Sequence, residues 1–190
     1  MNLSHCFLKG SIVKNLLSTE KYQAIHELIQ RAPVFSEIRD LNRFEEAVFE
    51  REKVISTGIG RNVAVAHAKV PDTDKVLVAL GISVKGIDYD ALDGKPVHFL
   101  FLIANNPKRQ EEYLKLLASI MRFIRNDSFR KFLLEKAASK LSPDEIGMSV
   151  RDAFLHALNN FSSQGKPKSK GQISESINRG VEKKAAAGGL

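Results

Sequence analysis

Residues 50–67 read EREKVISTGIGRNVAVAH, and this stretch decides the fold because it joins a helical pattern to a strand pattern. Apolar residues before it recur at the spacing of a helix, whereas its last five residues have the composition of a strand. Gly58 and Gly60 can adopt positive φ, so we expect a sharp turn between the two elements. Alternation along the strand then places Val65 and His67 on one face, with His67 at the end of the strand beside a loop.

Arg51 lies near the end of the helix that precedes this turn. It follows Val48 by three residues and Phe44 by seven, so we expect its side chain to continue the buried stripe and to point toward the sheet. An imidazole beside a guanidinium suits phosphoryl transfer, because a neutral ring nitrogen is a nucleophile and the planar guanidinium donates to phosphate oxygens. A histidine that only packs and an arginine that only supports the fold would leave the same pattern, so the residues alone leave both interpretations open.

The pattern outward from this stretch predicts helices on both sides of a small sheet. Toward the N-terminus, we expect a short strand and two helices, the second capped by Asp40, over residues 11–13, 20–31 and 40–52. After the strand at 63–67, two nearly continuous apolar runs predict strands covered on both faces, at 75–84 and 98–104.

Three more helices follow these strands. One begins at Asn106-Pro107, one is capped by Asp127, and one opens with a capping box at residues 142–145. Helices on two sides of a central sheet give an α+β fold arranged as a three-layer α/β/α sandwich.

Length and charge divide the chain into a folded body and a tail. The chain has 190 residues and a formal net charge of +7. From residue 161 onward, six lysine or arginine residues face two glutamates, so most of the excess charge lies at this end. We expect one domain over residues 1–162 and a flexible basic tail over 163–190. The tail lacks interleaved aromatic residues for stacking on bases, so nucleic acid is not an expected partner.

The composition also limits the compartment and the kinds of site. Cys6 is the single cysteine, so no internal disulfide can form and a reducing, cytoplasmic location is expected. No apolar run approaches the roughly 18 residues of a membrane-spanning helix, so we expect no integral membrane segment. No C-x-x-C or H-x-x-x-H spacing indicates a metal site. His98 begins an apolar strand, where a histidine bonded to the backbone is the expected arrangement.

Taken together, residues 51–53 (REK), 56–60 (STGIG) and 63–67 (VAVAH) resemble one family motif. It is the motif R-E-x-x-x-S-T-G-I-G-N-G-I-A-I-P-H of the enzyme IIA domains in the fructose–mannitol and nitrogen-regulatory branch of the phosphotransferase system. A second match is GKPV at residues 94–97, before an apolar run. The resemblance covers residues 8–150.

The resemblance implies a phosphohistidine carrier with an α/β/α sandwich around a small mixed sheet. His67 would accept a phosphoryl group from the carrier protein HPr or a paralogue, and Arg51 would stabilise that group. No metal or organic cofactor is implied. The loop residues implied near the phosphoryl group are Thr57, Gly58, Gly60 and Arg61.

The sequence departs from the family pattern at several positions. Arg61-Asn62 replaces Asn-Gly, and the added positive charge would help to bind a phosphate or a carboxylate on a partner. Ala66 replaces a proline, and Tyr113 stands where many members have a second histidine. Loss of that proline frees φ just before His67.

Three functions are therefore open. The first is a nitrogen-regulatory signalling protein, in which phosphorylation at His67 adds about −1.5 to −2 charges and switches the binding of a downstream regulatory target. The second is a sugar-transport IIA protein that donates its phosphoryl group to a IIB domain. The third is a degenerate interaction module that no donor phosphorylates.

Overall fold

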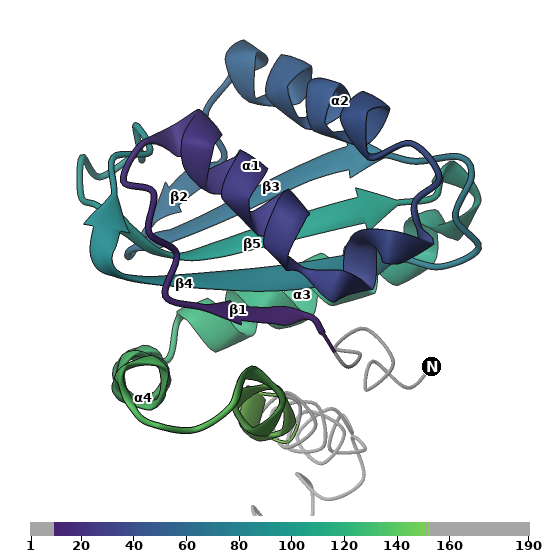
Figure 1. Cartoon of the computed structure of the whole chain (residues 1–190). Coiled ribbons are helices and arrows are strands. Elements are labelled where there is room, and N and C mark those ends of the chain that lie inside the picture. Colours follow the sequence, from purple (N-terminus) through teal and green to yellow (C-terminus); the bar gives the residue numbers. More distant parts are fainter. Residues whose placement is uncertain (1–9, 151, 153–190) are drawn as a thin grey trace, which may run out of the picture. The chain divides into compact units, whose positions relative to one another are not determined.

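The computed structural model describes residues 10–150 and residue 152 (Figure 1). The predicted tail at 163–190 and the end of the predicted domain lie outside the described residues. None of the helices in the described part is long and apolar enough to cross a membrane. The elements are β1 (Ile12–Lys14), α1 (Lys21–Arg31), the 3₁₀ helix η2 (Pro33–Glu37), α2 (Leu41–Val54), β2 (Gly58–Gly60), β3 (Val63–Lys69), β4 (Leu77–Ile87), β5 (Val97–Asn105), the 3₁₀ helix η3 (Pro107–Arg109), α3 (Gln110–Ile124) and α4 (Asp127–Ala138), followed by a helix at 143–150.

The five strands form one mixed sheet in the order β1-β4-β5-β3-β2. β3 is parallel to β5, with His67 opposite Ile103, whereas β4 runs antiparallel to β5. β1 joins the edge parallel to β4, and β2 joins the other edge antiparallel to β3. The mixed sheet implied by the family resemblance is confirmed.

Helices cover both faces of this sheet, as Figure 1 shows for α1 and α2 on one face and α3 on the other. Alternation along β3 separates the two sides of the core. Ala64 and Ala66 belong to the cluster that includes buried residues of α1 and α2. Val63 and Val65 belong to the cluster that includes Tyr113, Leu116 and Ile120 of α3. The predicted three-layer α/β/α sandwich is confirmed.

Helix ends follow the predicted capping chemistry with one shift. Asp40 caps α2 by accepting the amide of Arg43 at 2.9 Å. The capping box is reciprocal, since Ser142 and Glu145 each accept the other's amide, at 3.3 and 2.7 Å. The predicted cap of the fourth helix was wrong by one residue, because Asn126 accepts the amide of Phe129 and α4 begins at Asp127.

The turn predicted at Gly58 and Gly60 is displaced toward β3. Gly58–Gly60 is itself strand β2, and the hairpin turns at Arg61 and Asn62, whose φ angles are 55° and 65°. Two successive positive φ values define a type I′ turn, for which Asn-Gly is the favoured pair. Of the two glycines only Gly60 has positive φ, at 82°.

Candidate functional site

His67 lies near the C-terminal end of β3, half-buried on the face that α3 covers. Its Nδ1 lies 3.2 Å from the carbonyl oxygen of Val65. A carbonyl oxygen can only accept a hydrogen bond, so Nδ1 carries the proton in this contact. The neutral tautomer that results has its lone pair on Nε2, which makes Nε2 the nucleophilic atom of the ring.

The surroundings of His67 favour the neutral ring. Burial lowers the pKa of His67 below its ordinary value, and the positive charge of Arg51 lowers it further. The hydrogen bond to Val65 and the carboxylate of Glu52 act in the opposite direction without reversing the shift. The imidazole is therefore uncharged, and able to act as a nucleophile, at neutral pH.

The positive charge of Arg51 acts on His67 by lowering the pKa of its ring. The prediction that Arg51 continues the buried stripe of α2 was wrong. The stripe runs through Phe44, Val48 and Glu52 at spacings of four, and Arg51 is displaced to its flank. Its Nη1 donates to the carbonyl oxygen of Ile55 at 3.0 Å, beyond the end of the helix. Among the described residues, no acidic side chain forms an ion pair with Arg51.

Tyr113 in the first turn of α3 packs against His67 from the side of the helix layer. The two ring centroids are 5.8 Å apart, and the planes are tilted by 49°. Burial raises the pKa of the Tyr113 hydroxyl, so this group stays protonated and neutral. Tyr113 therefore restricts access of water to one side of the imidazole without adding a charge.

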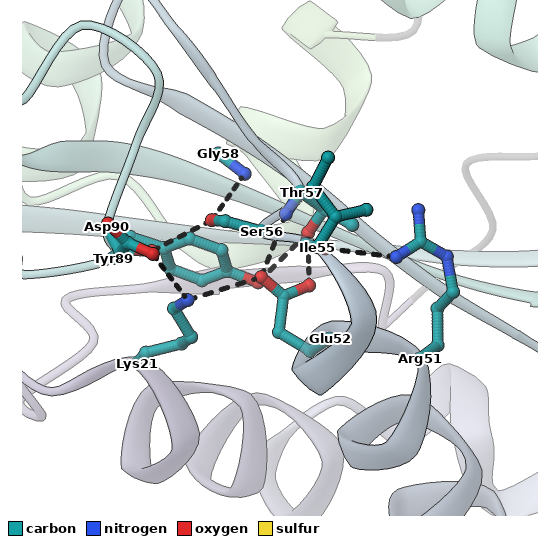
Figure 2. Close-up of polar contacts among 9 residues, drawn as sticks. All are labelled: Lys21, Arg51, Glu52, Ile55, Ser56, Thr57, Gly58, Tyr89 and Asp90. Atoms are coloured by element: carbon teal, nitrogen blue, oxygen red, sulfur yellow. Dashed lines mark hydrogen bonds and ion pairs between the residues drawn. The ribbon is translucent and has the colours of Figure 1, made fainter.

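A buried polar group that the sequence did not predict lies beside the candidate site (Figure 2). Glu52 is only 3% exposed. Its carboxylate accepts the amide of Thr57 at 2.8 Å and the hydroxyl of Thr57 at 2.6 Å. Lys21 approaches the carboxylate to 3.6 Å, and the hydroxyl of Tyr89 lies 3.3 Å from that of Thr57. We call Glu52, Thr57, Lys21 and Tyr89 the Glu52 cluster. Its one signal in the sequence is the spacing of Glu52 from Phe44 and Val48.

The four loop residues that the resemblance places near a phosphoryl group make contacts elsewhere in the fold. The hydroxyl hydrogen of Thr57 is already donated to Glu52. A Cβ on Gly58 would lie 2.8 Å from the Cα of Ala91, so close packing requires this glycine.

Gly60 and Arg61 lie at the other end of β3 from His67. β3 begins at Val63, so four residue steps of extended chain, about 13 Å, separate His67 from the end of the strand that follows the Arg61-Asn62 turn. The guanidinium of Arg61 lies 3.7 Å from the carboxylate of Asp127. The expectation that Arg61 adds its charge beside the histidine was therefore wrong, because an extended strand separates them.

Two further expectations about side chains can be compared with the structure. Nδ1 of His98 lies 2.8 Å from the carbonyl oxygen of Ser83, so the expected bond to the backbone is confirmed. Among residues 10–150 and 152, no three His, Cys, Asp or Glu side chains gather in a way that could hold a metal ion.

One family model and several known proteins match this chain. The family model "Phosphoenolpyruvate-dependent sugar phosphotransferase system, EIIA 2" matches residues 5–142. The fructose-specific EIIABC component of Bacillus subtilis is 33% identical over 135 residues, which are 71% of this chain and 21% of that protein. The chain thus spans about a fifth of that relative's length. The nitrogen regulatory protein of Bradyrhizobium diazoefficiens is 34% identical over 127 residues, which are 65% of this chain and 80% of that protein.

Solved structures show the same fold. Nitrogen regulatory protein IIA-Ntr from Neisseria meningitidis has a TM-score of 0.65 at 22% identity, covering 77% of this chain and 97% of that one. Enzyme IIAMTL of Escherichia coli, solved in complex with phosphorylated enzyme IIBMTL, has a TM-score of 0.57 at 18% identity, covering 75% of this chain and 96% of that one. The match over residues 5–142 extends beyond half of the chain, and the chain therefore belongs to the EIIA 2 family of the phosphoenolpyruvate-dependent sugar phosphotransferase system.

Proposed function

We propose that the chain is a phosphohistidine carrier in which Nε2 of His67 accepts a phosphoryl group from an HPr-like phosphocarrier protein. The observation that carries the proposal is the hydrogen bond from Nδ1 of His67 to Val65, which leaves the lone pair on Nε2. In the transfer, a P–N bond forms at Nε2 while the P–N bond to the donor's histidine breaks. Positive charge then develops on the His67 ring, and the carbonyl of Val65 stabilises it through the Nδ1 proton.

Arg51 is the proposed electrostatic partner of the phosphoryl group. Phosphoryl transfer depends on positioning and on neutralising the charge of the equatorial oxygens more than on covalent help from the protein. A guanidinium whose Nη1 is bonded to Ile55 has further N–H groups with which to donate to phosphate oxygens. Tyr113 would limit hydrolysis of the phosphohistidine by covering one side of the ring.

We further propose that the carrier is a cytoplasmic signalling protein of the nitrogen-regulatory type. The nitrogen regulatory protein of B. diazoefficiens supports this proposal, because this chain matches 80% of its length. A phosphoryl group at His67 would change the charge of the surrounding surface and so change its affinity for a regulatory target. The alternative is a sugar-transport IIA protein that passes the group to a IIB domain. The fructose-specific relative and the IIA–IIB complex support that alternative.

The proposal is tested by intact-mass analysis after incubation with phosphoenolpyruvate, enzyme I and HPr. We expect the addition of one acid-labile phosphoryl group, its loss in His67→Ala, and its retention in His26→Ala. His26 is a suitable control because it is exposed and pairs with Glu45 on the helix layer. If the native chain gains no group from several donors, or if His67→Ala still gains one, the carrier proposal is wrong.

A second assay distinguishes signalling from transport. A IIB domain is added to the phosphorylated chain, and transfer of the group is followed by mass. Rapid and complete transfer would favour the sugar-transport alternative, whereas stable retention on this chain would favour the signalling role.

A further inference from the structure

Arg51 and Glu52 are consecutive residues that hold the same turn from two sides. Nη1 of Arg51 donates to the carbonyl oxygen of Ile55 at 3.0 Å. The carboxylate of Glu52 accepts both the amide and the hydroxyl of Thr57, at 2.8 and 2.6 Å. Figure 2 shows the Arg51 side chain on one side of residues 55–57 and Lys21 and Tyr89 on the other. The turn that receives Arg51 is thus the turn that Glu52 fixes.

The Glu52 carboxylate is anchored firmly enough to fix this turn. A buried carboxylate is destabilising unless charges and hydrogen bonds compensate it. Lys21 at the start of α1 supplies the opposing charge at 3.6 Å, and its ammonium also lies 5.2 Å from the centre of the Tyr89 ring. The Tyr89 hydroxyl lies 3.3 Å from the Thr57 hydroxyl. The cluster therefore ties the last turn of α2 both to α1 and to the segment that follows β4.

Residues 55–57, the turn that Glu52 fixes, lie beside β3 on the way to His67. The amide of Val65 donates to the carbonyl of Thr57 at 3.1 Å, and β2 continues the pairing with β3 in the antiparallel sense. Going back along the chain from Thr57 to Ile55 therefore moves toward the C-terminal end of β3, where His67 lies. The carbonyl of Ile55 accordingly holds the guanidinium at the end of the sheet that carries the imidazole.

We propose that Glu52 is a positioning residue for phosphoryl transfer, because it fixes the turn whose Ile55 carbonyl holds the Arg51 guanidinium at the His67 end of the sheet. The inference rests on the carrier function proposed above. Among the described residues the Glu52 carboxylate is bonded to Thr57 and paired with Lys21, so it acts on Arg51 through Thr57 and the carbonyl of Ile55. Displacement of a charge-stabilising group by about 1 Å is enough to slow a reaction by up to a hundredfold.

The first test is a double-mutant cycle on the rate of phosphoryl transfer from HPr to His67. Glu52→Gln keeps the shape of the side chain but replaces one acceptor oxygen with a donor. We expect it to slow transfer about tenfold or more in the native background and less than twofold in Arg51→Ala, since both changes act on one group. Glu50→Gln, on the same helix but exposed and paired with Lys53, is the matched control and should leave the rate unchanged. Equal slowing in both backgrounds would overturn the proposal.

Thr57 offers a matched pair of variants for the same step. Thr57→Val removes the hydroxyl donor at constant shape, whereas Thr57→Ser retains it. We expect Thr57→Val to slow transfer and Thr57→Ser to restore most of the native rate. Urea unfolding of each variant shows whether it is folded in the assay. If folded Thr57→Ser transferred the phosphoryl group as slowly as Thr57→Val, the proposed role of the Glu52–Thr57 contact would be wrong.

The second test needs no phosphoryl donor, so it stands even if the carrier proposal fails. The pKa of His67 is measured by NMR titration in the native chain, Arg51→Ala, Glu52→Gln and the double variant. Arg51 lowers the pKa of His67, so Arg51→Ala should raise it. If Glu52 positions Arg51, the rise in the His67 pKa caused by Arg51→Ala is smaller when Glu52→Gln is already present. The direct effect of the Glu52 charge cancels, because each rise is measured between two proteins with the same residue at position 52. An unchanged rise would show that Arg51 keeps its place without Glu52, and the positioning role would be wrong.

Discussion

Gly58→Ala is the substitution whose effect follows most directly from the geometry of the turn. The φ angle of Gly58 is not positive, so an alanine there has no backbone strain and its effect is steric. The new Cβ would lie 2.8 Å from Cα of Ala91, 2.9 Å from its Cβ and 3.2 Å from Cδ1 of Tyr89. Favourable contacts between carbon atoms lie at about 3.5 to 4.0 Å, so these neighbours must move by roughly 0.5 to 1 Å.

The neighbours of Gly58 cannot move freely. The amide of Leu92 donates to the carbonyl of Gly58 at 2.9 Å, which holds Ala91 against the strand. Tyr89 is 1% exposed and belongs to the Glu52 cluster. Overpacking in such a site is destabilising by about 1 to 3 kcal/mol. We expect the upper half of that range, offset by about 0.4 to 1 kcal/mol because alanine restricts the unfolded chain. The net loss of unfolding free energy should be about 2 kcal/mol.

Urea unfolding followed by circular dichroism measures this loss, and Gly94→Ala is the matched control. Gly94 has a φ of 65°, and a Cβ added there would have no atom within 4 Å, so this variant isolates the cost of backbone strain. That cost is about 1 kcal/mol for an L-residue in the left-handed region. Gly58→Ala should therefore be the more destabilising of the two. A Gly58→Ala protein as stable as the native chain would refute the packing explanation for this glycine.

Three further predictions concern the hairpin, the histidine and the surface beside it. Arg61→Asn should raise the unfolding free energy by about 0.5 to 1 kcal/mol in urea, because Asn tolerates positive φ better than Arg does; a loss of stability would show that the exposed contact with Asp127 matters more. Burial lowers the pKa of His67 below 6.5, so the unfolded chain binds more protons than the folded one, and the unfolding free energy should fall as the pH drops from 6.5 through the lowered pKa. In His67→Gln, the urea midpoint should depend less on pH over that range. Ile55 is 61% exposed beside Arg51, and Ile55→Asn should raise KM for the phosphoryl donor about tenfold with little change in kcat if the donor covers it.

Elements with a strong local signal could be predicted from the sequence. β4 and β5 are nearly continuous apolar runs, and the capping box at 142–145 is a local device, so neither depends on distant residues. β2 could not be predicted, because Gly58–Gly60 has the composition of a turn and becomes a strand by pairing with the edge of β3. Pairing of this kind is a tertiary effect that overrides local propensity.

The site shows the same limit at the level of single residues. Arg51 and Glu52 are both charged and both stand close to the helical stripe, so spacing alone did not decide which is buried. Lys21 and Thr57 decide it, because they supply the charge and the donors that a buried carboxylate needs. Proximity in the sequence also misled at Arg61, since an extended strand carries it far from His67 within a few residues.

The family motif therefore divides into two parts with different physical roles. Residues 51–57 contain the proposed phosphoryl ligand, Arg51, and the contacts that hold it, so changes there should act on the rate of transfer. Residues 58–62 form the edge strand and the hairpin turn, with close packing at Gly58 and positive φ at Arg61 and Asn62. Changes there should alter the unfolding free energy, and they should alter the rate of phosphoryl transfer only if they shift the register of β3. The replacement of Asn-Gly by Arg61-Asn62 falls in the second part, so it is expected to affect folding while leaving the chemistry at His67 in place.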